Sequence, residues 1–309
     1  MGFPPAQGRR LPWEHLPAEV RAAIEQRLGA PVARATTRPG GFSPGLAATL
    51  ELADGRRVFA KAVGPEPNPD SPEFHRREVT IAAALPPDGP APRFFFSVEH
   101  EGWVVLVFED VEGHEPELPW REDELERVLD ALTELSNVLT PTPIAAPPVV
   151  ETVDELLHGW RSLEHPVDEW AAAHLEDLRA LEASWATGAV GETLLHGDIR
   201  ADNILLTPDR VVFVDWPHAC VGAAWIDLAL FLPSVAMQGG PRPWEIWETH
   251  PLGREVPSER LHPLLAGLAG YFAHRSTLPP PPGLPTLREF QRGQGVHALD
   301  WLRRSLAES

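Results

Sequence analysis

The stretch LLHGDIRADNILL at residues 194–206, followed by VVFVDW at residues 211–216, decides the fold of this chain. Its pattern is H-G-D-x4-N, then a turn, then an aspartate at the end of an apolar strand. Asp198 and Asn203 share one loop that enters a strand, and the turn at residues 207–210 returns the chain so that Asp215 can lie beside that loop. We expect the three polar side chains to converge; the alternative is a polar loop that only caps two strands.

These residue types match what phosphoryl transfer to a hydroxyl requires. One carboxylate must accept the hydroxyl proton, and two oxygen ligands must hold magnesium on the phosphates. Asp198 fits the role of the catalytic base, and Asn203 and Asp215 fit the roles of the metal ligands. The expected cofactors are therefore Mg2+ and a nucleoside triphosphate as phosphate donor.

An earlier strand carries a cation that needs a partner. The run VFAKAV at residues 58–63 places Lys61 inside an apolar strand, and lysine is seldom buried unpaired. Glu78, unlike Glu73, falls on the apolar stripe of the following helix and should face inward. That stripe consists of Phe74, Ile81, Ala82 and Leu85. We expect a Lys61–Glu78 ion pair that binds phosphates; a lysine facing solvent on an edge strand is the alternative.

Hydrophobic periodicity predicts an α+β fold with two parts. A small β-rich part, residues 1–110, begins with a helix and holds an antiparallel sheet with one main helix. The expected segments are a helix at 16–28, strands at 32–38, 46–52 and 57–63, a helix at 71–85, and strands at 93–99 and 103–108. Residues 111–309 form the larger part, with helices at 122–139, across 153–185 and from about 224 onward. A ligand cleft is expected between the two parts.

These motifs resemble the aminoglycoside phosphotransferase family, within the protein-kinase-like fold. The family pattern H-G-D-x4-N is HGD at residues 196–198 with Asn203, and the following I-D-W is VDW at residues 214–216. A further match is the D-L-A sequence that begins at Asp227. The resemblance covers about residues 30 to 300 and implies a bilobal fold, with a small antiparallel sheet and a larger helical lobe.

The resemblance also implies a nucleotide site. Gly41, Phe42 and Ser43 lie in the turn that would cover the phosphates, and Glu109 and Val111 would form the hinge that binds adenine. The hinge backbone would make those contacts, so ATP and GTP remain open as donors. Arg200, two residues after the proposed base, could contact the γ-phosphate during transfer, or could form a salt bridge with Asp202.

Composition limits the partners of the chain. The net charge is −19, with 45 acids against 26 bases, so nucleic acid and anionic membranes are not expected partners. The acid excess would attract a cationic acceptor, or it serves only solubility. The single Cys220 excludes an intrachain disulfide. The first residues, MGFPPAQGRRLPW, lack the apolar core of a signal peptide, and no long apolar segment follows, so we expect a cytoplasmic protein, monomeric or dimeric.

The acceptor should be a small hydroxylated molecule. Only eleven residues separate Asp215 from Asp227, which leaves no room for the activation segment of a protein kinase. A non-catalytic nucleotide-binding protein has usually lost at least one polar residue of the site. This chain keeps all five, which are Lys61, Glu78, Asp198, Asn203 and Asp215. The acceptor could be an aminoglycoside or another cationic antibiotic, or a metabolite resembling choline, a sugar or an amino acid. The segment 244–248, WEIWE, is either part of an acceptor pocket or an amphipathic core helix.

Overall fold

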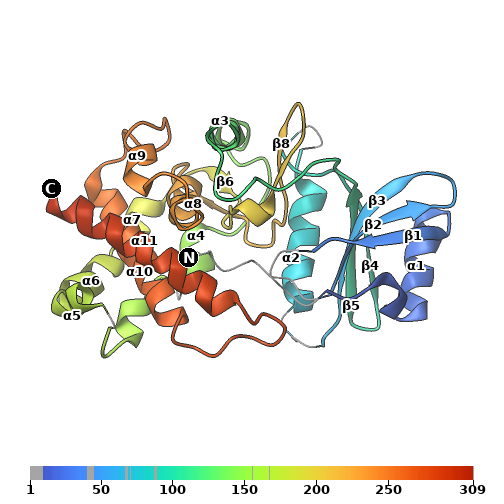
Figure 1. Cartoon of the computed structure of the whole chain (residues 1–309), viewed down its shortest axis with the longest axis horizontal. Helices are drawn as coiled ribbons and strands as arrows, with labels where there is room; N and C mark the ends of the chain where they lie inside the picture. Colours follow the sequence, from blue (N-terminus) through green and yellow to red (C-terminus); the bar gives the residue numbers. More distant parts are fainter. Residues whose placement is uncertain are drawn as a thin grey trace.

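The computed structural model describes residues 10–39, 45–66, 69, 71–86, 89–154, 156–166 and 168–308. A five-stranded antiparallel sheet lies at one end of the molecule and a larger helical part at the other (Figure 1). The predicted α+β, protein-kinase-like class is therefore confirmed. The division at residues 110 and 111 stays a prediction. Within the described ranges, none of the helices combines the length and the apolar character that a membrane crossing requires.

The sheet has the strand order β1-β2-β3-β5-β4. Its strands are β1 (Val32–Thr37), β2 (Leu46–Leu52), β3 (Arg57–Val63), β4 (Phe94–His100) and β5 (Trp103–Glu109). β2 and β3 form a hairpin, and Gly55 in its turn has a φ of 87°, a conformation that favours glycine. Each of these strands lies within two residues of the predicted position, because hairpin turns punctuate the apolar runs.

Both faces of the sheet are covered by helices. α1 (Ala18–Leu28) packs against one face, to which Val105 and Val107 contribute, and α2 (Ser71–Ala84) covers the face of Leu106 and Phe108. Because β5 is buried on both faces, its sequence is continuously apolar instead of alternating. α2 lies between the sheet and the helical part (Figure 1).

One prediction about α2 is wrong. Phe74 was assigned to the inward stripe, but its side chain is 38% exposed. Its ring lies 5.5 Å from the ring of His218, so it contacts the helical part and not the sheet. The expected burial of Glu78 and Ile81 is confirmed. The helix has neighbours on two sides, and a single apolar stripe does not describe such packing.

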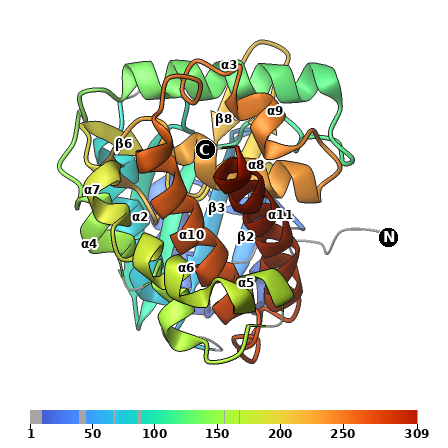
Figure 2. The ribbon, with the colours of Figure 1, turned by 90° about the vertical axis from the view of Figure 1, so that its left-hand side faces the viewer.

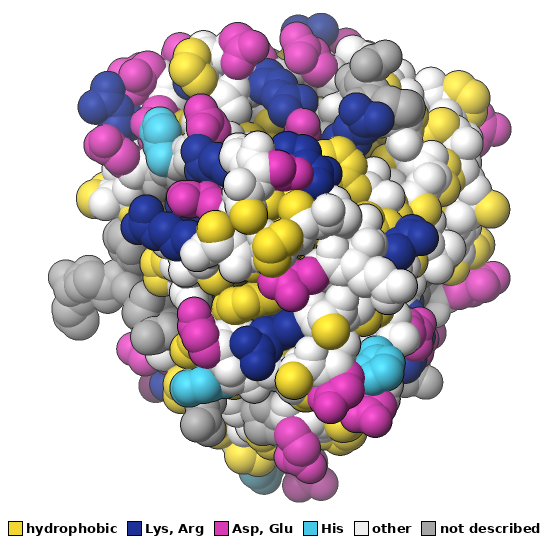
Figure 3. All heavy atoms as spheres, turned by 90° about the vertical axis from the view of Figure 1, so that its right-hand side faces the viewer, with side chains coloured by type: hydrophobic (Ala, Val, Ile, Leu, Met, Phe, Trp, Pro, Cys, Tyr) yellow, Lys and Arg dark blue, Asp and Glu magenta, His cyan; other side chains and the backbone are white. Residues whose placement is uncertain are grey.

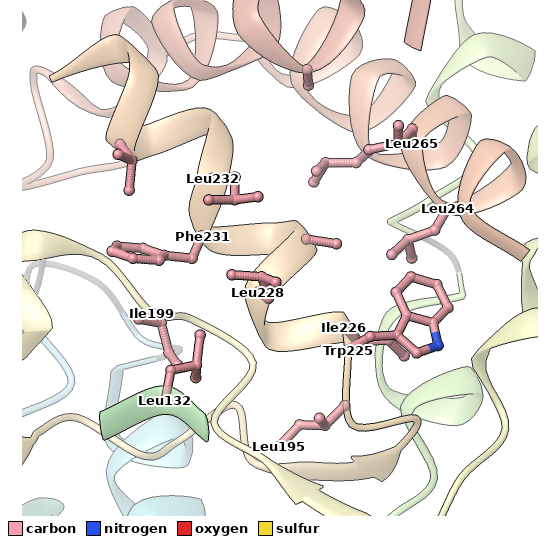
Figure 4. Close-up of a cluster of buried hydrophobic side chains, with 14 of the residues drawn as sticks. Leu132, Leu195, Ile199, Trp225, Ile226, Leu228, Phe231, Leu232, Leu264 and Leu265 are labelled. Carbon is pink, nitrogen blue, oxygen red and sulfur yellow. The ribbon is translucent and has the colours of Figure 1, made fainter. Parts of the chain in front are cut away.

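The helical part surrounds α8, whose residues are buried almost all round. Its helices are α3 (Glu122–Val138), α4 (Val149–Val153), α5 (Glu169–Ala173), α6 (Leu175–Glu182), α7 (Trp185–Ala189), α8 (Ile226–Met237), α9 (Pro243–Trp247), α10 (Ser258–Arg275) and α11 (Leu287–Ala307). Figure 4 shows Leu228, Phe231 and Leu232 of α8 in this core. α10 and α11 run side by side, as the helix pair in Figure 2 shows.

Two parts of the helical region differ from the prediction. The helical sequence predicted across residues 153–185 is present, but it is divided into short helices joined by turns, and these include the 3-10 helix η2 (Gly159–Ser162). A small antiparallel pair, β6 (Thr193–Leu195) with β9 (Cys220–Gly222), was not predicted. Each of these strands has three residues, and no tight turn joins the two, so only the pairing partner defines them.

Candidate functional site

The loop after β6 is held by hydrogen bonds from its own backbone. The carboxylate of Asp227, on α8, accepts hydrogen bonds from the backbone N–H groups of His196 and Gly197, at 2.8 and 2.9 Å. The ring of His196 contacts the carbonyl oxygen of Val214 at 3.0 Å. Burial lowers the pKa of His196 to about 4, so its ring is neutral at pH 7. His196 and Asp227 therefore brace the loop that presents Asp198.

Gly197 has a positive φ of 79°, and a Cβ at this position would lie 2.6 Å from the carbonyl oxygen of His218. The close approach of the backbone excludes a side chain here. This explains why the residue before Asp198 is glycine. The loop then passes through the 3-10 helix η3 (Ala201–Asn203) into the hairpin of β7 (Ile204–Leu206) and β8 (Val211–Phe213).

Asp198 and Asn203 are joined across this loop. The Nδ2 group of Asn203 donates to the carbonyl oxygen of Asp198 at 2.8 Å, and this orients the Asn203 amide oxygen away from that bond. Arg200 forms ion pairs with Asp198 and, at 3.0 Å, with Asp202. Burial lowers the pKa of Arg200, but the charges of Asp198 and Asp202 raise it by more. The salt bridge with Asp202, one of the two expectations for Arg200, is present.

The second strand of the hairpin leads to Asp215, which meets the cation of the sheet. Lys61 Nζ lies 2.6 Å from Glu78 Oε2 and 2.6 Å from Asp215 Oδ1. The Lys61–Glu78 pair expected from the helix pattern is thus confirmed. Asp215 has a φ of 71°, which is uncommon for a residue other than glycine, asparagine or aspartate. This backbone conformation turns its carboxylate toward the sheet.

Burial perturbs all three charges of this triad. It lowers the pKa of Lys61, but Asp215 and Glu78 raise that pKa by more, so the ammonium is charged. It raises the pKa of Asp215, but Lys61 lowers that pKa further, and the carboxylate is ionised at neutral pH. Glu78 is fully enclosed, and burial raises its pKa. The triad can hold a cation on one side and phosphate oxygens near Lys61.

The oxygen atoms present suit magnesium. Asn203 and Asp215 come from the two arms of one hairpin, and an amide oxygen and an ionised carboxylate are hard ligands. Among the described residues, no group of three or more His, Cys, Asp or Glu side chains could hold a metal ion. A magnesium ion bound by few protein atoms completes its shell with phosphate oxygens and water, so the residues fit that ion.

The connection after β5 carries the predicted hinge residues. Glu109 Oε1 accepts an ion-paired hydrogen bond from Arg210 at 3.0 Å, which links the sheet to the β7–β8 turn. A hollow of about 560 Å³ opens beside this connection, and Val111, Arg38 and Leu206 are among the residues that line it. Gly41, Phe42 and Ser43, predicted to cover the phosphates, lie outside the described residues.

Arg10 was not expected at the site. It is mostly buried, and the charges of Asp215, Asp202 and Glu115 raise its pKa against the larger lowering effect of burial. No motif marks Arg10, because only long-range packing brings it near these acids.

The segment WEIWE lies in and beside α9, and its buried residues belong to the core. The Trp247 ring lies 5.9 Å from the ring of Trp225 and 5.3 Å from the ring of Trp301. Ile246 is also buried. Of the two expectations for this segment, the contacts agree with an amphipathic core helix.

Comparisons with known proteins agree with this geometry. The sequence model of a family described as "Phosphotransferase enzyme family" matches residues 37–264. Among curated proteins, none matches the chain significantly. Solved structures do match. A thermostable mutant of the aminoglycoside phosphotransferase APH(4)-Ia, in complex with ADP and hygromycin B, is 15% identical, with a TM-score of 0.60 and coverage of 93% of this chain and 99% of that chain.

Two further similar structures are of kinases whose names give acceptors other than an aminoglycoside. Choline kinase LicA from Streptococcus pneumoniae is 15% identical, with a TM-score of 0.60, and the match covers 94% of this chain and 100% of that chain. A putative fructosamine-3-kinase from Haemophilus somnus is 11% identical, with a TM-score of 0.55 and coverage of 93% and 96%. At these sequence identities the similarity establishes the fold. It does not transfer the acceptor of any of these proteins to this chain.

Proposed function

The chain belongs to the phosphotransferase enzyme family, and from this premise we propose that it transfers the γ-phosphate of ATP or GTP, with Mg2+, to a hydroxyl of a small molecule. The observation that carries the proposal is the convergence of Lys61, Asp215 and Asp198 at one place. A phosphate-binding cation, a metal ligand and a base come from the sheet, the hairpin and the catalytic loop respectively. Phosphoryl transfer needs these parts and little covalent chemistry from the protein.

Each residue has a proposed role. Lys61, held by Glu78, binds the α- and β-phosphates, and the hinge backbone near Glu109 and Val111 binds the base beside the hollow that opens there. Gly41, Phe42 and Ser43 would cover the phosphates. Asn203 and Asp215 would hold magnesium, which supplies charge neutralisation on the phosphates when bound.

Asp198 is the proposed catalytic base, and it accepts the proton of the acceptor hydroxyl while that oxygen attacks the γ-phosphorus. Its side chain is 29% exposed, so an acceptor can reach it. Arg200 positions Asp198 through their ion pair. The oxygen between the β- and γ-phosphorus atoms leaves with the nucleoside diphosphate.

The experiment is a turnover assay of the full chain with Mg-ATP and Mg-GTP over hydroxylated antibiotics and metabolites. We expect phosphorylation of at least one acceptor. Asp198→Asn should lower kcat by at least about a hundredfold and leave nucleotide affinity nearly unchanged, because the base contacts the acceptor. Asp130→Asn, a charge-matched change at an exposed position of α3, should have no effect. Asp198→Asn activity within about tenfold of wild type would contradict the assignment.

The same screen separates the remaining candidates. A cationic antibiotic as the best acceptor would support the reading drawn from the net charge of −19, and would place the enzyme in antibiotic resistance. A choline-like, sugar or amino-acid acceptor would support a metabolite kinase. Nucleotide binding without any transfer would instead indicate a non-catalytic nucleotide-binding protein.

A further inference from the structure

The ends of α10 and α11 lie on the acceptor side of the catalytic loop. The Arg200 guanidinium carbon lies 5.9 Å from the centre of the Phe290 ring, on α11. Tyr271, on α10, is buried enough that its pKa is raised, and the charges of Asp198 and Arg200 both act on it. In the proposed reaction Lys61 and Asp215 bind the nucleotide, which leaves the side of the catalytic loop that meets α11 for the acceptor. In Figure 1 the loop joining α10 to α11 runs on the side of the helical part that faces the sheet.

A chain of hydrogen bonds fixes an arginine at this place. Gln291 Nε2 donates to the hydroxyl oxygen of Tyr271 at 3.1 Å, and Arg288 Nη1 donates to Gln291 Oε1 at 2.8 Å. Arg288 Nε also donates to the carbonyl oxygen of Pro279 at 3.1 Å. These bonds use two of the five donors of the guanidinium and hold the group in one orientation.

A second arginine stands beside the first. Arg275, in the last turn of α10, has its guanidinium carbon 5.7 Å from the centre of the Tyr271 ring. Arg288 binds Gln291, which binds the Tyr271 hydroxyl, and Arg275 lies over the same ring, so the two cations lie near each other. Burial lowers the pKa of Arg288, and the charge of Arg275 lowers it further. The same two charges lower the pKa of the neighbouring His274, after burial. Two positive charges are therefore gathered where the end of α10 meets the start of α11.

Within the described ranges, neither Arg275 nor Arg288 forms an ion pair with an acid. The chain has 45 acids and 26 bases, so acids are plentiful, and Arg200 has two of them. Local structure explains part of the arrangement, because Arg275 suits a helix C-terminus and Arg288 binds a carbonyl. It does not explain why two cations meet at Tyr271 with no ion pair among the described residues.

Resting on the phosphotransferase function proposed above, we propose that the acceptor carries an anionic group, a carboxylate or a phosphate, which Arg275 and Arg288 bind while its hydroxyl faces Asp198. Guanidinium donors match the oxygens of both groups in geometry and charge. A cationic acceptor would meet repulsion from the two arginines. The net charge of the whole chain thus does not predict the charge around Arg275 and Arg288.

The first experiment measures binding without turnover. Saturation-transfer NMR of the full chain, with the nucleotide site filled by Mg-ADP, compares glucuronate and glucose 6-phosphate with glucose and glucosamine. We expect at least one anion to bind more tightly than both other sugars, and the two anions distinguish carboxylate from phosphate recognition. Equal binding of glucosamine or glucose, or no binding of either anion, would overturn the proposal.

Variants identify the residues. Arg275→Gln and Arg288→Gln together should weaken anion binding by about 10- to 100-fold, the usual effect of losing charged hydrogen bonds. Arg288→Lys keeps the positive charge but loses the planar set of guanidinium donors, so it should retain part of the affinity for the anion. Arg34→Gln, exposed on β1, is the charge-matched control and should change nothing. Anion affinity that is unchanged in the double variant would contradict the assignment even if an anion binds.

The two proposals fail in different ways. If anions bind selectively but no acceptor is phosphorylated, the proposed activity is wrong and the anion site stands. If a neutral or cationic acceptor is phosphorylated, and the double variant leaves its KM unchanged, the activity stands and the anion site is wrong. With an anionic acceptor the double variant should raise the acceptor KM and leave the KM of Mg-ATP unchanged.

Discussion

Arg200 divides its guanidinium between two carboxylates of its own loop. It pairs with Asp198 and with Asp202, and its side chain is 13% exposed. Removing the cation leaves Asp198 free to rotate and leaves Asp202 buried without its partner. We expect Arg200→Gln to lower kcat by about 10- to 100-fold with a small change in the KM of Mg-ATP.

The conservative variant separates positioning from loss of fold. Arg200→Lys keeps a positive charge beside Asp198 but loses the planar guanidinium, so it should restore part of kcat. The thermal midpoint Tm of each variant checks that the fold is retained. A kcat of Arg200→Gln equal to that of the wild type would contradict the positioning role.

Asp215 has two proposed tasks, and one substitution removes the charge that both require. In Asp215→Asn the side chain keeps its shape but loses the charge that pairs with Lys61 at 2.6 Å and would hold magnesium. We expect the magnesium concentration for half-maximal turnover to rise by about tenfold or more, because a neutral amide is a weaker ligand. Asn203→Ala should act in the same direction.

Asp209 provides the control for this pair. It sits in the turn of the same hairpin, where its carboxylate accepts a hydrogen bond from the Thr207 hydroxyl at 2.8 Å. Asp209→Asn should leave the magnesium dependence unchanged. An unchanged dependence in both Asp215→Asn and Asn203→Ala would remove them from the metal site.

At the residue scale, local spacing explains which positions were predictable. Asp198, Asn203 and Asp215 are fixed to each other by one loop and one hairpin, so the sequence defines their geometry. Arg275 and Arg288 come together only because two helices pack, and the 11 residues between α10 and α11 carry no signal of it. Single charged residues on helices are too common to stand out.

At the element scale, α2 connects the sheet to the Asp215 segment, because its Glu78 contacts Lys61 and Lys61 contacts Asp215. Glu78 is 2% exposed and contacts Lys61, whereas Glu73 of the same helix is exposed. Glu78→Gln leaves Lys61 with Asp215 as its only carboxylate partner among the described residues. We expect the KM of Mg-ATP to rise by about 10-fold or more, because the lysine is held less firmly at the phosphates.

Glu73→Gln is the matched control, since it removes the same charge from the solvent face of α2. Its exposed contacts with Arg76 and Arg77 contribute little to stability. A KM that rises equally in both variants would mean that charge on the helix matters and the ion pair does not.

Elements with a repeated pattern or a tight turn were predictable, and short isolated ones were not. The five strands of the sheet and α3 carry long apolar or amphipathic runs. β6 and β9 have three residues each, and α4, α5 and α7 have five each, so their ends depend on tertiary contacts. The inward assignment of Phe74 failed for a related reason, because α2 packs on two neighbours.

At the scale of the whole molecule, the acid excess is a property of the surface. Figure 3 shows the end of the molecule that carries the sheet, where acidic and basic side chains are interspersed. Several acids among the described residues are paired with arginines, as in Arg57–Asp110 at 2.6 Å. Many others must repel one another, because 45 acids face only 26 bases. The folded chain brings these charges closer together than the unfolded chain does.

This repulsion predicts how salt affects the stability of the protein. At pH 8 the chain is far above its isoelectric point of about 5.1, and raising NaCl from about 10 mM to about 300 mM shortens the screening length to less than 10 Å. Repulsion in the compact state weakens more than in the unfolded state, so Tm should rise by a few degrees. Near pH 5.5 the net charge is small, and the same salt should change Tm little or lower it, since only the attractive pairs are then screened. Differential scanning fluorimetry at the two pH values measures both effects. A Tm that falls with salt at pH 8 would show that ion pairs such as Arg57–Asp110 outweigh the repulsion of the unpaired acids.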